Sequence, residues 1–271
     1  MLKRMKEHLK RTFKTFLKMD FTKKFFITYL GCWISFLSVS MLSKVVVFLS
    51  SFLTPSNPEG AIKTVEYVAS KKFEVVSSSI SSHVDHSYLS LVLTYFLNNS
   101  ISCLVILLAY ILTAYLYRRE VKEDPKALED YIDALMLIYI VTVVNPLTGI
   151  LGYRLDIEHL VVIVPHGIFE FAGLALSIVT GLTLAERILP LECLQSSKGI
   201  FTGDIILKII VALMLIGFAA LLEPLDWMIY QYSLYYGEDL LELLVKTYLG
   251  ILKFLPYSVL PVGLFQHLYN R

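Results

Sequence analysis

The chain has 271 residues, of which 56% are hydrophobic and 17% are charged, and its formal net charge is +1 at pH 7. Soluble domains average about 45–50% apolar and about 25% charged residues. The composition therefore excludes an ordinary soluble domain and predicts an integral membrane protein. The near-neutral charge gives no reason to expect a nucleic-acid partner. Three cysteines, Cys32, Cys103 and Cys193, are an odd number without metal-type spacing, so no disulfide framework is implied.

Residues 1–24 form a strongly basic segment, with nine Lys and Arg against two acids. It is too long for the charged part of a cleavable signal peptide, and no small-residue cleavage site follows the next apolar run. Leu9, Phe13, Phe16 and Leu17 alternate with lysines, which is typical of an amphipathic helix. We expect this helix to lie against anionic lipid. Packing on a neighbouring protomer is the alternative.

Six hydrophobic segments follow, each near the roughly 20 residues that a transmembrane helix requires. They are Phe25–Leu42, Leu89–Tyr117, Ala134–Leu151, Leu160–Leu184, Ile205–Leu222 and Leu243–Gln266. The sixth contains two lysines and two prolines, which favour a tilted, kinked or re-entrant helix. The predicted fold is an all-α, polytopic transmembrane bundle of about six segments, the first five better defined than the sixth.

The loop between the first two segments, residues 54–88, has its own helical pattern. It opens with Ser56-Asn57-Pro58-Glu59, which combines a capping side chain, a proline and an early acid. Apolar residues then recur at spacings of three and four and form one stripe: Ile62, Val65, Ala69, Phe73, Val76 and Ile80. We predict an amphipathic helix that lies on the outer leaflet or covers the bundle.

The distribution of basic residues predicts the orientation of the chain. With the N-terminus inside, the inner segments hold sixteen Lys and Arg, whereas the outer segments hold four. Basic loops stay on the cytoplasmic side of a membrane. We therefore predict a multi-pass protein of the plasma membrane with a cytoplasmic N-terminus.

The fourth segment contains two ionisable residues, His166 and Glu170. They are four residues apart, so on a helix they share one face. Ionisable groups at membrane depth are costly and mark interiors or aqueous cavities. Because Pro165 precedes them and suits the first turn of a helix, we predict a mutually bonded polar pair near a helix start. The alternative is a pair at the hydrated headgroup boundary without a special role.

Small residues continue along the same face of the fourth segment. Gly173, Ser177 and Gly181 recur at intervals of four. At about 100° per residue they fall on the side of His166 and Glu170. Small residues in this pattern let two helix backbones approach closely in lipid. The stripe therefore predicts that this face packs against protein, within or between subunits.

Polar residues of other segments are predicted to reach a similar depth. Asn98 and Asn99 interrupt the second segment, Asn145 breaks the outer end of the third, and Glu223 with Pro224 ends the fifth. A buried asparagine needs hydrogen-bond partners. We predict that these residues converge with His166 and Glu170 in the outer half of the bilayer. Independent roles as helix caps or packing contacts are the alternative.

These features follow one another in a recognisable order. They are Asn98-Asn99, Asn145 with Gly149 and Gly152, the run Pro165-His166-Gly167-Ile168-Phe169-Glu170, Gly181-Leu182-Thr183-Leu184, and Glu223. Over roughly residues 20–225, their order and spacing resemble the stage II sporulation protein M family of integral membrane proteins. The chain departs from that family at Pro146, where glycine is usual, and in residues 226–271, which extend beyond its usual end.

The resemblance implies a domain organisation and a role. Residues 25–225 would form the family's transmembrane domain, between the basic segment 1–24 and an additional hydrophobic segment in 226–271. In spore-forming bacteria the family looks like a scaffold that gathers cell-wall-degrading enzymes at the engulfing septum. Most members occur where no sporulation happens. The resemblance therefore supports a plasma membrane protein of a prokaryote, bacterial or archaeal.

Three functions are compatible with these patterns. We expect first a non-enzymatic scaffold without cofactor, metal or catalytic residue, which self-associates in the bilayer and contacts other membrane or cell-envelope proteins. The alternative is a channel or transporter in which His166, Glu170, Asn99 and Glu223 line an ion or solute path. A second alternative is an intramembrane enzyme. Metal hydrolases normally assemble three protein ligands, and the sequence has no HExxH arrangement.

Overall fold

The computed structural model describes residues 2–54, 57, 59–84, 87–144, 155–190 and 200–258. All regular secondary structure in these ranges is α-helical, which confirms the all-α part of the predicted fold. The helices are α1 (Leu2–Leu17), α2 (Phe21–Leu53), α3 (Gly60–Ser81), α4 (Tyr88–Glu123), α5 (Ala127–Val144), α7 (Ile157–Ile188), α8 (Gly203–Tyr236) and α9 (Leu240–Ser258). Helices α2, α4, α7 and α8 each overlap a predicted hydrophobic segment and extend beyond both of its ends.

Four helices of the described residues, α2, α4, α7 and α8, are long and apolar enough to cross a membrane. These residues therefore contain four candidate membrane spans, as expected of a membrane protein. The third predicted segment overlaps α5, and its remainder, residues 145–151, lies outside the described residues. The sixth overlaps α9, which carries Glu242, Lys246 and Lys253 and is described only to Ser258.

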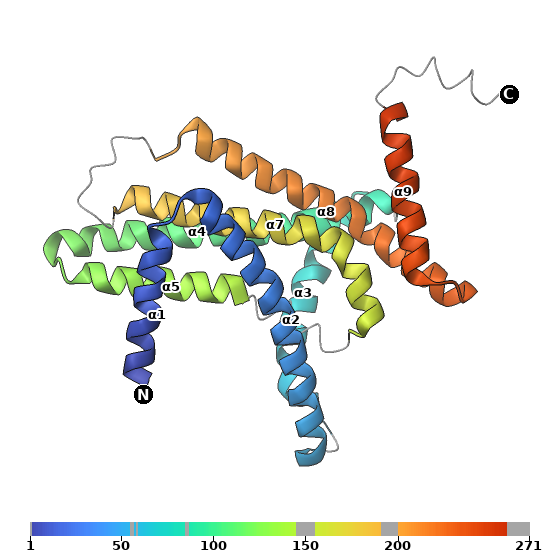
Figure 1. The fold of residues 1–271 in the computed structure, drawn as a ribbon, viewed down its shortest axis with the longest axis horizontal. Coiled ribbons are helices and arrows are strands. Elements are labelled where there is room, and N and C mark those ends of the chain that lie inside the picture. The colour runs from blue at the N-terminus through green and yellow to red at the C-terminus, as the bar shows by residue number, and fades with distance from the viewer. Residues whose placement is uncertain are drawn as a thin grey trace.

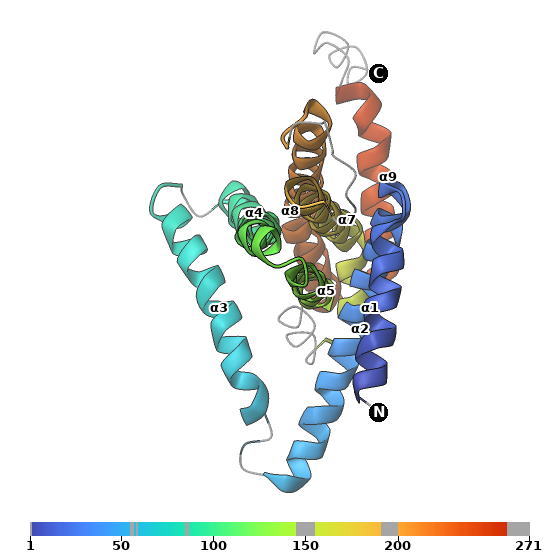
Figure 2. The same ribbon diagram turned by 90° about the vertical axis from the view of Figure 1, so that its left-hand side faces the viewer.

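Helices α4, α5, α7 and α8 run side by side as a bundle, seen from the side in Figure 1 and nearly end-on in Figure 2. The central helix is α7, which contacts α2, α4, α5 and α8. Its middle turns are fully buried, including Ile178, Val179 and Leu182. The middle of α7 is thus enclosed by protein, while α2, α4 and α8 expose many large apolar side chains.

Helices α1, α3 and α9 lie across the bundle axis in both views (Figures 1 and 2). The apolar face of α1 packs on α5, where the rings of Phe13 and Phe16 lie 5.6 Å and 4.8 Å from the Tyr139 ring, centroid to centroid. Both phenylalanines are buried. The predicted amphipathic helix is present, but protein rather than lipid covers this face.

Ion pairs attach the polar side of α1 to α5. Lys10 contacts both Glu129 and Asp133 at 2.8 Å, Lys6 contacts Asp133 at 2.8 Å, and Lys14 contacts Glu129 at 2.7 Å. Hydrogen bonds from Lys10 and Lys14 hold the pKa of Glu129 below its ordinary value. Partial burial acts to raise the pKa of Asp133, but the bonds from Lys10 and Lys6 outweigh it and lower this pKa also.

Two prolines lie inside helices, contrary to the sequence-based expectation. Pro165 is not in the first turn of α7, since the helix begins about two turns earlier. Pro224 does not end α8, which continues to Tyr236. A proline removes one backbone donor and bends a helix without necessarily ending it. Figure 1 shows the first turns of α7 bent away from the rest, and near Pro224 the Tyr88 hydroxyl donates to the Leu221 carbonyl.

Candidate functional site

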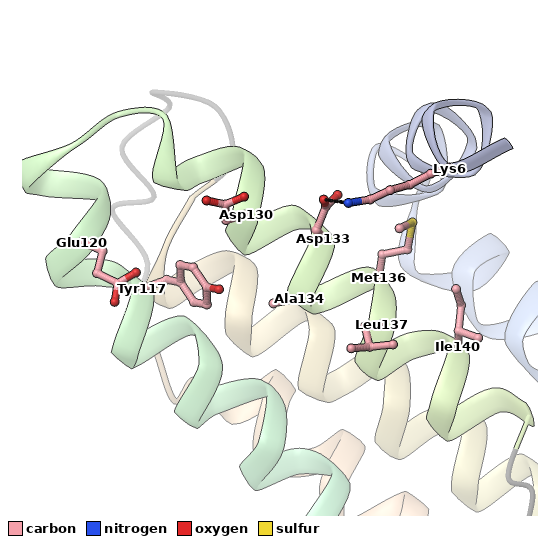
Figure 3. Close-up of a pocket in the computed structure, with 9 residues that line it drawn as sticks. All are labelled: Lys6, Tyr117, Glu120, Asp130, Asp133, Ala134, Met136, Leu137 and Ile140. Carbon is pink, nitrogen blue, oxygen red and sulfur yellow. Dashed lines mark ion pairs between the residues drawn. The ribbon is translucent and has the colours of Figure 1, made fainter. Parts of the chain in front are cut away.

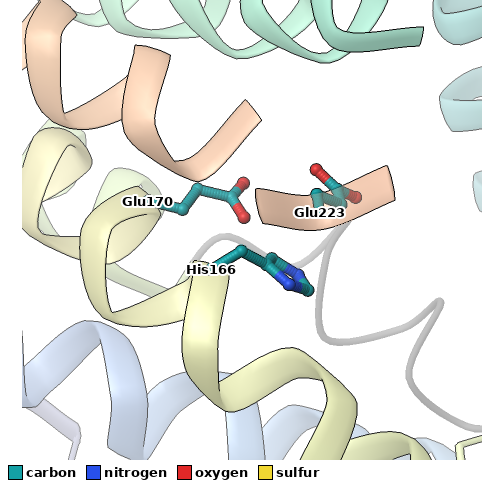
Figure 4. A group of neighbouring side chains, drawn as sticks. All are labelled: His166, Glu170 and Glu223. Atoms are coloured by element: carbon teal, nitrogen blue, oxygen red, sulfur yellow. The ribbon is translucent and has the colours of Figure 1, made fainter. Parts of the chain in front are cut away.

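A polar cluster, with its histidine buried and its two glutamates partly buried, lies between α7 and α8. It contains His166 and Glu170 of α7 and Glu223 of α8, and one imidazole nitrogen and one oxygen of each carboxylate lie within 4.8 Å of one another. In Figure 4 the two carboxylates point toward each other from neighbouring helices, with the imidazole beside them. The structure thus brings together three of the residues that the sequence nominates.

The small residues of α7 explain how the two helices approach so closely. A Cβ atom at Gly173 would lie 2.8 Å from the Ile216 side chain and 3.0 Å from the Ala212 carbonyl oxygen, both in α8. Gly173 is three positions after Glu170, so this contact is about one turn from the cluster. A larger residue at position 173 would move α8, and Glu223 with it, away from α7.

The rest of the stripe packs within the same subunit. A Cβ atom at Gly181 would lie 2.7 Å from the ring of Tyr110 in α4. Ser177 is buried and its hydroxyl donates to the Gly173 carbonyl at 2.9 Å. The stripe therefore contacts α8 near the cluster and α4 one to two turns further along.

Asp226 is the residue of the cluster that sequence reasoning missed. Its side chain is completely buried, and its Oδ2 lies 2.8 Å from Nδ1 of His166. Its Oδ1 accepts a hydrogen bond of 2.6 Å from the Tyr248 hydroxyl of α9. Because a carboxylate accepts, His166 donates from Nδ1 and keeps its Nε2 lone pair. The bonded partner of His166 is thus Asp226, and the predicted His166–Glu170 hydrogen bond is not among the bonds of the described residues.

A sequence signal for Asp226 did exist. It follows Glu223 by three residues, so a continuous helix places both carboxylates on one face. The assumption that Pro224 ends the segment hid this relation. The proposed domain boundary after residue 225 accordingly falls inside α8.

Lys72 of α3 approaches the cluster from the side of α4. Its Nζ donates to the Asn98 carbonyl at 2.9 Å and to the Ser102 hydroxyl at 2.5 Å. It also acts electrostatically on Glu170. The Asn98 side chain donates to the Asn99 side chain at 3.1 Å. Asn98 therefore contacts Lys72 and Asn99, and in the described part of the chain the hydrogen bonds of the two asparagines do not extend to His166 or Glu170. Asn145 lies outside the described residues.

The charges of the cluster do not balance. With His166 neutral, the carboxylates of Glu170, Glu223 and Asp226 and the Lys72 ammonium leave two negative charges if all are ionised. Glu223 in particular faces two other acids, Glu170 and Asp226. Like charges in a low-dielectric interior are unfavourable unless a proton or a bound cation neutralises them.

A groove of about 560 Å³ lies beside the cluster, between α4 and α8. Its lining includes Tyr95 and Pro224, the residue next to Glu223, and Tyr95 interacts electrostatically with Glu223 and Glu170. A second groove of about 550 Å³ lies between α1, α4 and α5 and holds the Lys6–Asp133 ion pair (Figure 3). At 1.5 Å per residue, Tyr95 of the first groove and Tyr117 of the second lie about 33 Å apart along α4.

Comparison with known proteins gives one close relationship. The chain is 35% identical over 252 residues to the uncharacterized protein MJ0096 of Methanocaldococcus jannaschii, and the alignment covers 90% of this chain and 94% of that protein. No family model and no solved structure matches the chain. The similarity therefore extends through nearly the whole length of both proteins.

Proposed function

The chain belongs to the same family as the Methanocaldococcus jannaschii protein MJ0096, and we propose that it is a membrane transport protein. In this proposal a cation binds in the cluster of His166, Glu170 and Glu223 and crosses the membrane through the α7–α8 region. The single observation that carries the proposal is that two partly buried carboxylates, Glu170 and Glu223, lie together beside the buried His166. A purely structural cluster would be expected to balance its charges.

The location of the cluster supports this role. Helices α7 and α8 are both candidate spans, and the cluster lies within them rather than at their ends. Acidic residues and histidines inside spans are typical of ion pathways and proton relays. The groove lined by Tyr95 and Pro224 lies on the same part of α8 as Glu223 and offers a route toward it.

The topology is part of the same proposal. We place the N-terminus in the cytoplasm and the protein in the plasma membrane, with about six segments, from the asymmetry of basic residues. Single cysteines at positions 71 and 122, both exposed, test this in a background without native cysteines. An impermeant thiol reagent should label position 71 and not position 122 in intact cells. The opposite pattern would reverse the orientation.

Transport is tested by cation uptake into proteoliposomes that contain the purified full chain. We expect Glu170→Gln and Glu223→Gln to reduce uptake at least tenfold, because each amide keeps the shape and removes the charge. Glu158→Gln is the matched control, since Glu158 is an exposed acid in the first turn of α7. Uptake should be followed for protons and for divalent cations. Absence of uptake by the parent protein, or equal uptake by all variants, would refute the proposal.

A second candidate is the self-associating scaffold that the resemblance to the stage II sporulation protein M family implies. The observation that favours it is an arm, the second half of α2 and the first half of α3, which projects beyond the bundle in Figure 2. The arm exposes large apolar side chains at its end, among them Phe48, Phe52 and Leu53. Such an arm could contact a second copy or another envelope protein.

Crosslinking distinguishes an interface between copies from a surface covered by lipid. A single cysteine at Phe52 should give dimers in membranes if the arms of two copies meet. A cysteine at Leu108 is the control, because that residue is similarly exposed on α4 within the bundle. Equal crosslinking at the two positions would remove support for the scaffold.

A further inference from the structure

We propose that the buried cluster binds one divalent transition-metal ion, with His166, Glu170 and Glu223 as its protein ligands. This inference rests on the proposed cation-binding function and names the class of cation. Zn²⁺, Mn²⁺ and Co²⁺ belong to the class, whereas Na⁺, Mg²⁺ and Ca²⁺ do not.

The arrangement of donor atoms is the first support. One imidazole nitrogen and two carboxylate oxygens lie within 4.8 Å of one another. Atoms that share a metal at about 2.0–2.2 Å lie about 3–4 Å apart. Small side-chain rotations of Glu170 and Glu223 would therefore complete the site without movement of α7 or α8.

The hydrogen bonds of His166 are an independent second support. Histidines that bind metals usually donate their other ring N–H to a carboxylate, which fixes the tautomer and the ring orientation. His166 has this partner in Asp226, at 2.8 Å and fully buried. Asp226 is held in turn by Tyr248 at 2.6 Å. This chain of contacts leaves Nε2 as the ring atom available to a metal.

The chemistry of the donors selects the class of ion. Imidazole is a ligand for first-row transition metals, while Mg²⁺ and Ca²⁺ prefer sites made of oxygen alone. The charge agrees as well. When ionised, the two ligand carboxylates of Glu170 and Glu223 carry two negative charges, which one divalent ion neutralises. Cys32 and Cys103, the cysteines in the described part of the chain, are not members of the His166–Glu170–Glu223 group, so their thiols do not compete as metal ligands.

The first test is metal binding by the purified full chain, stripped with a chelator and dialysed against Zn²⁺ or Co²⁺. The parent protein and Glu158→Gln should each bind one equivalent. Glu170→Gln and Glu223→Gln should lose at least 100-fold in affinity. Asp226→Asn should lose 10- to 100-fold, because it alters the group that orients His166 without removing a ligand. Unchanged affinity in both glutamine variants, or no binding by the folded parent, would overturn the metal site.

X-ray absorption at the zinc edge tests the parent protein alone, in case a variant does not fold. We expect one imidazole with oxygen neighbours and no sulfur; a sulfur shell would refute the site. The outcome is also separable from transport. Proton uptake that depends on Glu170 without metal binding would overturn the metal site and leave transport standing. Metal binding without any uptake would leave the metal site standing and overturn transport.

Discussion

Helix α7 contains two buried acids whose surroundings differ. Near its end, Glu186 accepts two hydrogen bonds from Lys24, at 2.9 Å and 3.0 Å, and the Lys24 side chain is only 5% exposed. Near its middle, Glu170 lies beside Glu223 of α8, and Lys72, which acts electrostatically on Glu170, donates its hydrogen bonds to neutral groups of α4. The first site is a matched pair that joins α2 to α7. The second has more acidic than basic groups.

The comparison separates structural from functional use of buried charge. A matched ion pair is complete within the fold, so removing one member should destabilise it. An unbalanced cluster is incomplete, so removing one acid from the metal-free protein should relieve repulsion while abolishing cation binding. Stability measurements should therefore show a large loss at the matched pair and little or no loss at the cluster.

The largest expected effect is at the matched pair. Lys24→Met should cost about 3 kcal/mol of unfolding free energy, near the lower end for a broken buried pair because Glu186 is 23% exposed. Adding Glu186→Leu to the Lys24→Met variant should recover most of the lost unfolding free energy. Glu170→Gln in metal-free protein should cost less than about 1 kcal/mol because it removes a like charge beside Glu223. Unfolding in mixed micelles measures all three. A larger loss from Glu170→Gln than from Lys24→Met would invert the comparison.

The next effect concerns the packing that brings the cluster together. Gly173→Ala should cost about 1–3 kcal/mol, because its Cβ would lie 2.8 Å from Ile216. Gly250→Ala in α9 is the control, since nothing lies within 4 Å of the added atom there. It should be neutral or stabilising by up to about 1 kcal/mol. Thermal unfolding compares the two variants. Equal behaviour would mean that α7 and α8 do not need this close approach.

A double-mutant cycle sharpens the assignment within the cluster. His166 and Asp226 share a buried hydrogen bond, so their alanine variants should show a coupling energy of about 1–2 kcal/mol. The cycle of His166 with Glu170 should give less, since no hydrogen bond between them is described. Unfolding of the single and double variants provides both values. Stronger coupling to Glu170 would restore the pair that the sequence predicts.

The smallest effect is the pH dependence of the contact between α1 and α5. The folded pKa values of Glu129 and Asp133 are lowered, so their contribution is present above the ordinary values of 4.5 and 3.8. It is lost as pH falls through the lower folded values. Protease sensitivity of α1 in detergent should rise in that range. The double variant Glu129→Gln/Asp133→Asn should lose this pH dependence. A pH dependence that persists in the double variant would come from other groups.

Helical periodicity allowed part of the site to be predicted. His166 and Glu170 are four residues apart, and Gly173, Ser177 and Gly181 continue on the same side. Such relations depend only on the geometry of one helix. The structure shows these residues buried or partly buried on the face that meets α8 and α4.

Contacts between residues of different helices were harder to predict from the sequence. Asp226 follows His166 by 60 residues, and Lys24 precedes Glu186 by 162 residues. No periodicity connects such distant positions, because their separation depends on how whole helices pack. Pro224 added a second obstacle, since a proline in a sequence reads as a helix end even when the helix continues.

The sequence by itself determined the helical membrane class and the face of α7 that is polar, because hydrophobic length and helical period are local properties of the chain. Only the tertiary structure decided which groups meet on that face. It paired His166 with Asp226 and Lys24 with Glu186, and it left Glu170 beside Glu223. The physical reason is that charge balance depends on distances between helices, and packing rather than sequence order sets those distances.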